Sequence, residues 1–317
     1  MLNILILVLG FVLLIYGANG LVDGASSLAK RYNIPNIVIG LTIVAFGTSS
    51  PELVVNVMAS ANDRSDIALG NIVGSNIFNI LAILGLSAII CPLSVKSNTT
   101  WIEIPLNLLS ALVVLTMAND IFLDGTETSV ISRTEGIGLI FFFIIFMVYN
   151  LSLMKNNSFE SQVNIKYFTR SKSLIYILFG LMGLILGAKL IVESASDIAR
   201  AFGISERIIG LTIVSVGTSA PELATSLAAA YKKNVDLAIG NIVGSNIFNF
   251  FLVLGLSSIV NPVRVNVNSN IDLLVNVGAG LLLFIFIFTG KKRQLERWEG
   301  TLLFLLYFLY LTFLIMW

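Results

Sequence analysis

Residues 40–87, which begin GLTIVAFGTSSPEL and end DIALGNIVGSNIFNILAILGLS, occur a second time in the chain. Residues 210–257 begin GLTIVSVGTSAPEL and end DLAIGNIVGSNIFNFFLVLGLS. A shift of 170 residues aligns the two stretches without a gap, and 28 of the 48 positions are identical. Asn, Ser and Glu keep their register in both copies, which shared hydrophobicity alone does not explain. The sequence is therefore an internal duplication.

The composition of the chain is that of a membrane protein. Of its 317 residues, 56% are hydrophobic and only 12% are charged, whereas a soluble domain has about 25% charged residues. Apolar runs of about 20 residues, the length that crosses a bilayer as a helix, recur along the sequence. Because these runs are continuous and do not alternate, an outer-membrane barrel is disfavoured. The run from Leu2 to Ala18 lacks a basic start and a cleavage site, so we expect a membrane helix there and not a signal peptide.

Cysteine and histidine are almost missing from the sequence. Cys91 is the only cysteine and there is no histidine, which removes disulfides, thiolate clusters and the usual proton shuttle. No Ser/His/Asp or metalloprotease arrangement is present, so we expect no enzyme. A metal ion handled by this chain is expected to be hard and bound through oxygen. We expect no resident cofactor and no nucleic-acid partner.

Gly, Pro and charged residues divide the sequence into ten predicted transmembrane helices. The first half contains Leu2–Leu21, Ile34–Ala61, Ile67–Ile90, Trp101–Ala118 and Ile131–Met154. The second half contains Leu174–Ser194, Ile208–Tyr231, Leu237–Val260, Ile271–Thr289 and Gly300–Met316. We divide the chain into a first repeat (1–154), a cytoplasmic linker rich in Asn and Ser (155–173) and a second repeat (174–317). The predicted fold class is an all-α polytopic membrane protein.

Basic residues orient the predicted helices. With the N-terminus outside, 13 of the 19 Lys and Arg residues fall in cytoplasmic loops, as the positive-inside rule expects. Lys189 falls within the sixth span, and five residues fall outside, namely Arg64, Arg133, Arg200, Arg207 and Arg264. We therefore expect a multi-pass protein of the inner membrane, with the N- and C-termini both outside and with lipid as its solvent.

The odd number of spans in each half determines how the halves are related. Because each half has five spans, the second copy enters the membrane from the opposite side. A pseudo-two-fold axis in the membrane plane then relates the copies, and the fold is predicted to be two inverted-topology repeats of five helices. This architecture is typical of secondary transporters, whose binding site lies at mid-membrane between the repeats.

Each copy carries one glutamate inside an apolar span, at the end of GTSSPE (Glu52) and of GTSAPE (Glu222). An ionisable side chain inside a membrane helix is costly and indicates function. The preceding proline cannot donate to a carbonyl one turn earlier, which frees backbone oxygens. A structural ion pair is the alternative, but these spans offer no buried base, and Lys189 has Glu193 four residues away. We therefore assign the two glutamates to a cation site.

A polar stripe follows in the third and eighth spans. Polar residues recur every four positions in each copy of GNIVGSNIFN, at Asn71, Ser75 and Asn79, and at Asn241, Ser245 and Asn249. This spacing places them on one helix face. A hydrogen-bonded seam between helices is the alternative, and it fits Asn71, Asn76, Asn241 and Asn246. Cation binding is favoured for the others, because hydroxyl and amide oxygens beside two carboxylates suit Ca²⁺ or Na⁺.

These two motifs resemble the repeats of the Ca²⁺/cation antiporter superfamily, most closely its prokaryotic sodium/calcium exchangers. The resemblance covers the ten-span architecture. It implies a central site whose four corners are Glu52, Asn79, Glu222 and Asn249. It also implies hydroxyl and carbonyl ligands around these corners, at Thr48, Ser49, Ser75, Thr218, Ser219 and Ser245, and at the backbone carbonyls of Ala45 and Ser215. We expect the antiporter to function as a monomer.

One position departs from that family's pattern. Such exchangers commonly have Asp where this chain has Asn249, so the site carries at most two negative charges. One Ca²⁺, two Na⁺ or two H⁺ would balance them, and K⁺ coupling is disfavoured because potassium-dependent relatives also use an acid there. We expect exchange of Ca²⁺ for Na⁺ by alternating access, with H⁺ as the rival counter-ion. A channel is disfavoured, because one compact pair of acids is not a ring repeated by oligomeric symmetry.

The resemblance also implies that the first and sixth spans slide to expose the site to either side. Glycines along both spans fit a smooth sliding face, at Gly17, Gly20 and Gly24, and at Gly180, Gly183 and Gly187. Ordinary packing of small residues between membrane helices explains them equally well.

Overall fold

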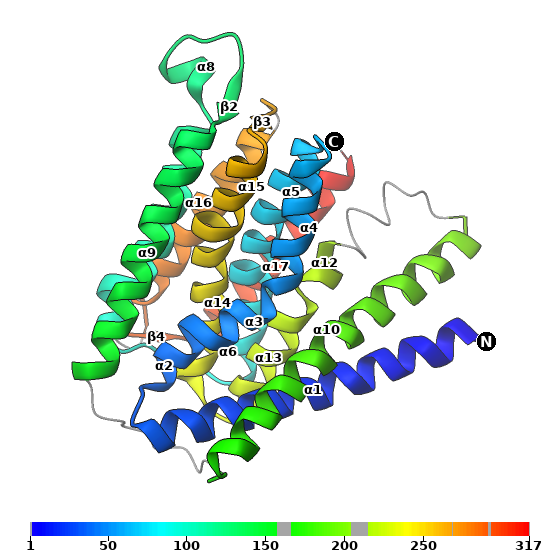
Figure 1. Cartoon of the computed structure of the whole chain (residues 1–317), viewed down its shortest axis with the longest axis vertical. Coiled ribbons are helices and arrows are strands. Elements are labelled where there is room, and N and C mark those ends of the chain that lie inside the picture. Colours follow the sequence, from blue (N-terminus) through cyan, green and yellow to red (C-terminus); the bar gives the residue numbers. More distant parts are fainter. Residues whose placement is uncertain (1, 157–165, 204–214, 268, 291–292, 317) are drawn as a thin grey trace.

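The computed structural model of the chain is a bundle of tilted helices (Figure 1). It describes residues 2–156, 166–203, 215–267, 269–290 and 293–316. Within these ranges, eight helices are long and apolar enough to cross a membrane, and Asn36–Thr48 with Ser50–Ala61 forms a further span bent by 49°. Of the predicted seventh span, residues 208–214 lie outside the described ranges and the remainder is helical. The predicted all-helical membrane fold is confirmed.

The helices of the first repeat include short π-helical turns, labelled η, in three of its spans. In chain order they are α1 (Leu2–Tyr32), α2 (Asn36–Ile39), η1 (Gly40–Val44), α3 (Ala45–Thr48), α4 (Ser50–Ala61), α5 (Ser65–Ile77), η2 (Phe78–Leu84), α6 (Gly85–Ile90), η3 (Thr99–Glu103), α7 (Ile104–Met117), α8 (Asp120–Leu123) and α9 (Arg133–Asn156). Turns η1 and η2 have an α-helix on both sides, and η3 is followed by one. The spans that contain them are therefore not α-helical throughout.

The second repeat follows the same order from α10 (Arg170–Ala201) onward. Its remaining helices in the described part of the chain are α12 (Ser215–Thr218), α13 (Ala220–Tyr231), α14 (Val235–Ile247), η5 (Phe248–Leu254), α15 (Gly255–Val260), α16 (Ser269–Phe286) and α17 (Arg297–Met316). The break between α12 and α13 is at Ser219, 170 residues after the break at Ser49 between α3 and α4. The local backbone therefore repeats with the sequence.

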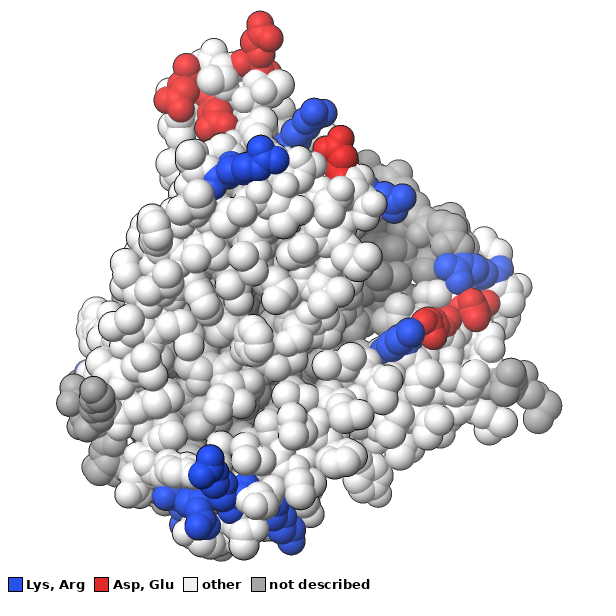
Figure 2. Space-filling view, in the orientation of Figure 1, with Lys and Arg blue, Asp and Glu red and all other residues white. Residues whose placement is uncertain are grey.

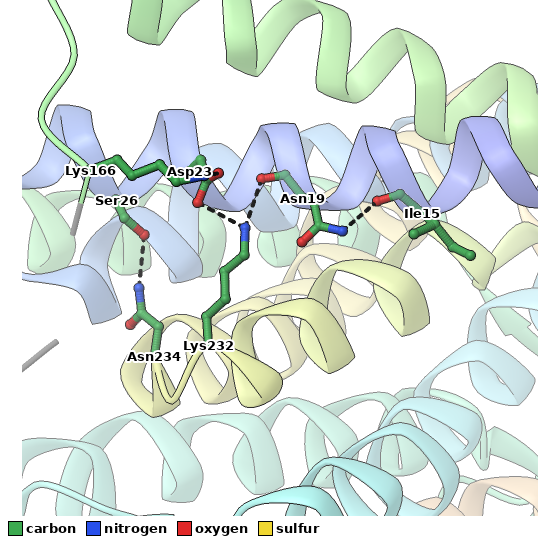
Figure 3. A network of polar contacts seen from close by, with 7 residues as sticks. All are labelled: Ile15, Asn19, Asp23, Ser26, Lys166, Lys232 and Asn234. Atoms are coloured by element: carbon green, nitrogen blue, oxygen red, sulfur yellow. Dashed lines mark hydrogen bonds and ion pairs between the residues drawn. The ribbon is translucent and has the colours of Figure 1, made fainter. Parts of the chain in front are cut away.

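The first helix is longer than the sequence predicted. The predicted end at Leu21 assumed that Asp23 stops the apolar run, yet α1 continues to Tyr32. Within this longer helix, Lys232 at the end of α13 and Lys166 both reach the Asp23 carboxylate, at 2.8 and 2.9 Å (Figure 3). The helix ends where Asn33 adopts a left-handed φ of 52°.

Helices α1 and α10 lie side by side and run in opposite directions, tilted away from the other helices (Figure 1). Their backbones approach closely at Gly17 and Gly180, where a Cβ added to Gly17 would lie 2.8 Å from the Gly180 carbonyl oxygen. Only glycine permits that approach. Opposite directions for the first helix of each repeat are what an inverted duplication requires.

Two small antiparallel ladders join the repeats at opposite ends of the molecule. Strand β1 (Leu93–Ser94) pairs with β4 (Gln294–Leu295), and β2 (Ser129–Ile131) pairs with β3 (Val263–Val265). In Figure 1 the β2–β3 ladder lies at the end with α8, and β4 lies at the other end. Each ladder has one strand from each repeat, so the two halves are tied together on both sides. The sequence did not predict these strands.

The third and eighth spans form the centre of the bundle. Both spans, Ser65–Ile90 and Val235–Val260, are 83% buried inside the protein, whereas Arg133–Met154 and Arg297–Leu314 are only 22% buried. A span that faces lipid leaves its apolar side chains uncovered by protein, as these outer spans do. The two polar stripes of the repeated motif are therefore carried by the two most buried of the eight straight spans in the described ranges.

Candidate functional site

Both predicted glutamates lie at a break in a membrane helix. Glu52 is in the first turn of α4 and Glu222 is in the first turn of α13. The residue before each helix has left the helical conformation, with φ −85° and ψ 5° at Ser49, and φ −89° and ψ 9° at Ser219. Each carboxylate thus sits near the positive end of a helix, which favours its charge. Both glutamates are 1% exposed.

Each glutamate is held by a serine of the opposite repeat. The Ser49 hydroxyl donates to Glu222 Oε1 at 2.8 Å, and the Ser219 hydroxyl lies 3.3 Å from Glu52 Oε1. These two contacts are related by the 170-residue shift. They place the carboxylates from α4 and α13 beside one another at the repeat interface, as the inverted fold predicted.

The serines of the polar stripe complete the hydroxyl groups around the carboxylates. Ser75 Oγ lies 3.0 Å from Ser219 Oγ, and Ser245 Oγ lies 3.4 Å from Glu222 Oε1. Both stripe serines are buried. Three predicted hydroxyl ligands, those of Ser49, Ser219 and Ser245, therefore contact a glutamate, and Ser75 contacts Ser219.

The amide corners are bonded to each other's repeat as well. Asn79 Nδ2 donates to Asn246 Oδ1 at 2.9 Å, and Asn249 Nδ2 donates to Asn76 Oδ1 at 3.0 Å. The oxygen of each corner amide takes no part in these hydrogen bonds. Among the described residues, one oxygen at each of the four corners is buried without a hydrogen-bond partner, namely Glu52 Oε2, Glu222 Oε2, Asn79 Oδ1 and Asn249 Oδ1.

The threonine and carbonyl ligands of the first repeat lie just before the helix break. The Thr48 hydroxyl is 3.1 Å from the Val44 carbonyl and 3.3 Å from that of Ala45. The Ala45 carbonyl also accepts the Ser49 N–H at 2.9 Å, so this oxygen is already engaged twice. In the second repeat Ser215 begins α12, directly after residues outside the described ranges, and its ligand role stays a prediction.

Asn71 and Asn241 form the seam that was the alternative to cation binding. Thr48 Oγ1 lies 3.2 Å from Asn241 Oδ1, and Thr218 Oγ1 lies 3.3 Å from Asn71 Oδ1. Asn241 Nδ2 donates to Ser226 Oγ at 2.9 Å. These contacts cross between repeats or between neighbouring spans, so the two asparagines hold helices together around the site.

Two buried polar residues beyond Glu52 were missed by the sequence analysis. Asn56 and Ser60 follow Glu52 at intervals of four residues on α4, and both are at most 1% exposed. Asn56 Nδ2 donates to the Glu52 carbonyl at 2.6 Å. The four-residue spacing could have found them. They were overlooked because the two copies differ at these positions, where the second copy has Ser226 and Ala230.

The site holds two carboxylates and no further strong ligand. The described residues contain no cluster of three or more His, Cys, Asp or Glu side chains. A set of carboxylate, amide, hydroxyl and carbonyl oxygens matches the preference of hard cations. Fold and site together define a class of protein, a helical membrane transporter with inverted repeats and a pair of buried glutamates, surrounded by oxygen atoms, between them.

Comparison with known proteins identifies the family. The sequence profile described as sodium/calcium exchanger protein matches residues 2–152 and 172–316. The sodium/calcium exchanger MaX1 of Methanosarcina acetivorans is 33% identical over 344 residues, and the match covers 98% of each chain. Inner membrane protein YrbG of Escherichia coli is 35% identical, over 82% of this chain and 81% of that one.

A solved structure has the same fold over nearly the whole chain. The sodium-calcium exchanger NCX_Mj, soaked with 10 mM Na⁺ and zero Ca²⁺, matches with a TM-score of 0.84 and 35% identity, covering 98% of both chains. The chain belongs to the sodium/calcium exchanger family. It is therefore a multi-pass antiporter for cation/calcium exchange and not an enzyme, as its sequence predicted.

Proposed function

We propose that this antiporter exchanges one Ca²⁺ for Na⁺ at the site formed by Glu52, Glu222, Asn79 and Asn249. The observation that carries the proposal is the set of four buried oxygens, one from each of these residues, that have no hydrogen-bond partner among the described residues. A buried carboxylate or amide oxygen without a partner is costly. A cation bound between the four would satisfy all of them at once. The remaining ligands that we propose are the hydroxyls of Thr48, Ser49, Ser75, Thr218, Ser219 and Ser245, and the carbonyls of Ala45 and Ser215.

The charge of the site supports coupled exchange. Glu52 and Glu222 are both buried, and the contacts of their carboxylates are with serine hydroxyls, so no base in the described part of the chain pairs with them. Two uncompensated charges inside a membrane protein are unfavourable. An empty site would therefore cross the membrane rarely, whereas a site loaded with Ca²⁺ or with monovalent cations would cross readily. This difference couples the two fluxes.

Alternating access is assigned to α1 and α10. These two long helices contact each other along backbone surfaces of glycine, and they lie at the edge of the bundle (Figure 1). The close backbone approach at Gly17 and Gly180 joins the two helices to each other, which supports movement of the pair as one unit relative to the helices that carry the site.

The charge distribution supports an orientation with both termini outside. In Figure 2 acidic side chains gather at the end of the molecule with α8, and basic side chains gather at the opposite end of the same face. Basic residues concentrate on the cytoplasmic side of membrane proteins. The α8 end, with Asp120 and Asp124 on an exposed turn, is then outside. The relative from Escherichia coli is described as an inner membrane protein, and we propose the same membrane for this chain.

Proton coupling is a second candidate, favoured by Asn249. With amides at both 79 and 249, two protons on Glu52 and Glu222 would neutralise the site fully. Two Na⁺ would do the same, whereas three would leave a positive charge. The two couplings differ only in which monovalent cation the carboxylates accept in place of Ca²⁺.

Uptake of radiolabelled Ca²⁺ into proteoliposomes tests both candidates. The protein is reconstituted once, and a Na⁺ gradient and a pH gradient are applied separately. We expect uptake driven by the Na⁺ gradient with the pH held equal on both sides. Uptake driven by the pH gradient alone would replace Na⁺ by H⁺, and uptake under neither gradient would refute exchange of Ca²⁺.

A further inference from the structure

Each of the two corner amides can direct either its oxygen or its NH₂ group at the site, whereas both ends of a glutamate carboxylate are oxygens. An asparagine side chain has a donor end and an acceptor end of nearly the same shape. Only the oxygen end can bind a cation, and an NH₂ group turned toward the ion would repel it. Something in the structure must therefore decide which end of Asn79 and Asn249 faces the site.

The hydrogen bonds of Asn76 and Asn246 decide it. Asn249 Nδ2 donates to Asn76 Oδ1 at 3.0 Å, and Asn79 Nδ2 donates to Asn246 Oδ1 at 2.9 Å. Because the NH₂ groups are engaged in this way, the oxygens of both corner amides are turned elsewhere, and both are buried without a hydrogen-bond partner among the described residues.

Asn76 and Asn246 are themselves fixed by the backbone. Asn76 Nδ2 donates to the Asn246 carbonyl at 3.3 Å, and Asn246 Nδ2 donates to the Asn76 carbonyl at 3.4 Å. A backbone carbonyl can only accept a hydrogen bond. If either side chain turned over, its oxygen would face that carbonyl oxygen, and its NH₂ would face the NH₂ of a corner amide. Both contacts would be repulsive, so the network has a single polarity.

We infer that Asn76 and Asn246 are positioning residues, which turn the oxygen of each corner amide, and not its NH₂ group, toward the cation. Each acts across the repeat interface: Asn76 orients Asn249, and Asn246 orients Asn79. The inference rests on the proposed function, since it explains how the site presents its ligands to Ca²⁺. The amide at 249 is compatible with this pairing in every protonation state of the site. An ionised carboxylate there would have no hydrogen for Asn76 Oδ1, so an acid would have to be protonated or turn Asn76 against the Asn246 carbonyl.

A double-mutant cycle on Ca²⁺ binding tests this crossed pairing. We expect Asn76→Ala to weaken Ca²⁺ binding by about 10- to 100-fold, the usual cost of removing a group that orients a metal ligand. If Asn76 acts through Asn249, Asn76→Ala will cost nothing more in an Asn249→Ala background, because the oriented ligand is already gone. In an Asn79→Ala background the same change will keep its full cost, because Asn79 is oriented by Asn246.

Calorimetric titration of purified protein with Ca²⁺ measures these affinities without requiring transport. The mirror variant Asn246→Ala provides an independent cycle, and it is expected to couple with Asn79→Ala and not with Asn249→Ala. Asn150→Ala is the matched control, because Asn150 is a fully buried asparagine of α9 whose amide donates to the Phe146 carbonyl at 2.9 Å. We expect it to leave Ca²⁺ affinity unchanged.

The outcomes separate this inference from the proposed function. Equal losses from Asn76→Ala in the Asn249→Ala and Asn79→Ala backgrounds would overturn the crossed pairing, and so would a loss in the Asn150→Ala control of the same size. Either result is compatible with Ca²⁺ exchange by the wild-type protein. Failure of the wild-type protein to bind Ca²⁺ would instead refute the proposed function.

Discussion

The two repeats agree closely at the cation site and differ at the ends of their first helices. At the site, Ser49 contacts Glu222 at 2.8 Å and Ser219 contacts Glu52 at 3.3 Å. At the helix ends, Asp23 of α1 is paired with two lysines and its side chain is 16% exposed. The equivalent residue of α10 is Glu193, which is 60% exposed and lies 3.8 Å from Lys189.

The difference reflects what each region has to do. In the mechanism that we propose, the site presents the same ligands when it faces either side of the membrane, and both repeats are then held to one arrangement. The first helices have no such constraint. Lys232 holds α1 by donating to Asp23 and to the Asn19 carbonyl, and Asn234 donates to Ser26 at 2.8 Å (Figure 3). At the positions 170 residues earlier than Lys232 and Asn234 the chain has Asn62 and Arg64, so the sequence does not repeat this attachment.

The attachment of α1 is stable at neutral pH. The hydrogen bond that Lys166 donates to Asp23, together with the negative charge of Asp23, raises the pKa of Lys166, so this lysine remains protonated well above neutrality. Asp23 then keeps a positive partner on each of its two carboxylate oxygens, Lys166 on one and Lys232 on the other. One end of α1 is thus held by charge, whereas the equivalent part of α10 carries an exposed pair within its own helix.

Removing either glutamate should have the largest effect, and the effects should be equal. We expect Glu52→Gln and Glu222→Gln each to lower Ca²⁺ affinity by more than the roughly 10- to 100-fold that loss of a supporting residue costs. The reason is that each carboxylate supplies half of the site's charge. Radiolabelled Ca²⁺ uptake into proteoliposomes measures the loss. Glu193→Gln is the control and should behave as wild type, whereas wild-type uptake by either site variant would show that the site lies elsewhere.

The serines that reach across the interface should have the next largest effect. We expect Ser49→Ala and Ser219→Ala each to weaken Ca²⁺ binding by about tenfold or more, because a hydrogen bond to a charged group contributes about 1.5–3 kcal/mol. Ca²⁺ titration of the purified variants measures this change.

Ser50→Ala is the matched control for both serines. Its hydroxyl donates to the Phe46 carbonyl of its own span at 2.7 Å and does not contact a glutamate. It should leave the affinity unchanged. A strong loss in only one of the two cross-interface variants would break the symmetry that the geometry of the site indicates.

At the close crossing of α1 and α10, alanine substitutions at two nearby glycines should change the free energy of unfolding in opposite directions. A Cβ on Gly17 would lie 2.8 Å from the backbone of α10, whereas a Cβ on Gly20 would have its nearest neighbour at 3.6 Å. We expect Gly17→Ala to lower the free energy of unfolding by about 1–3 kcal/mol through overpacking. Gly20→Ala should raise it by about 0.5–1 kcal/mol, because alanine is the better helix residue. Thermal unfolding in detergent compares them, and equal shifts would argue against a close backbone contact.

Much of this architecture could be predicted from the sequence, because it depends on features that a membrane imposes. The inverted repeat followed from the 170-residue register and the odd number of spans. Glu52 and Glu222 followed from the cost of charge in lipid, and the structure brings both to the repeat interface. These inferences need no knowledge of which residues touch.

The parts that could not be predicted depend on pairing between distant residues. The end of α1 was placed at Leu21 because charged residues were taken to end the spans, whereas the helix continues to Tyr32 and Asp23 pairs with Lys232, 209 residues away. Asn76 was assigned to a seam, and its action on Asn249 depends on which end of each amide faces which partner. The β1–β4 and β2–β3 ladders are too short to give a pattern in sequence.

The smallest effect should come from the attachment that distinguishes α1 from α10. We expect Lys232→Met to lower the free energy of unfolding by about 1 kcal/mol, because a partly exposed ion pair contributes little and Asp23 keeps Lys166 as a partner. This corresponds to a fall of about 2 °C in the melting temperature. Lys189→Met removes the pair at the equivalent place on α10, where both side chains are at least 60% exposed, and should leave the melting temperature unchanged. If both variants lowered the melting temperature by the same amount, the two helix ends would be equally well attached. The two repeats would then differ in sequence at this place but not in stability.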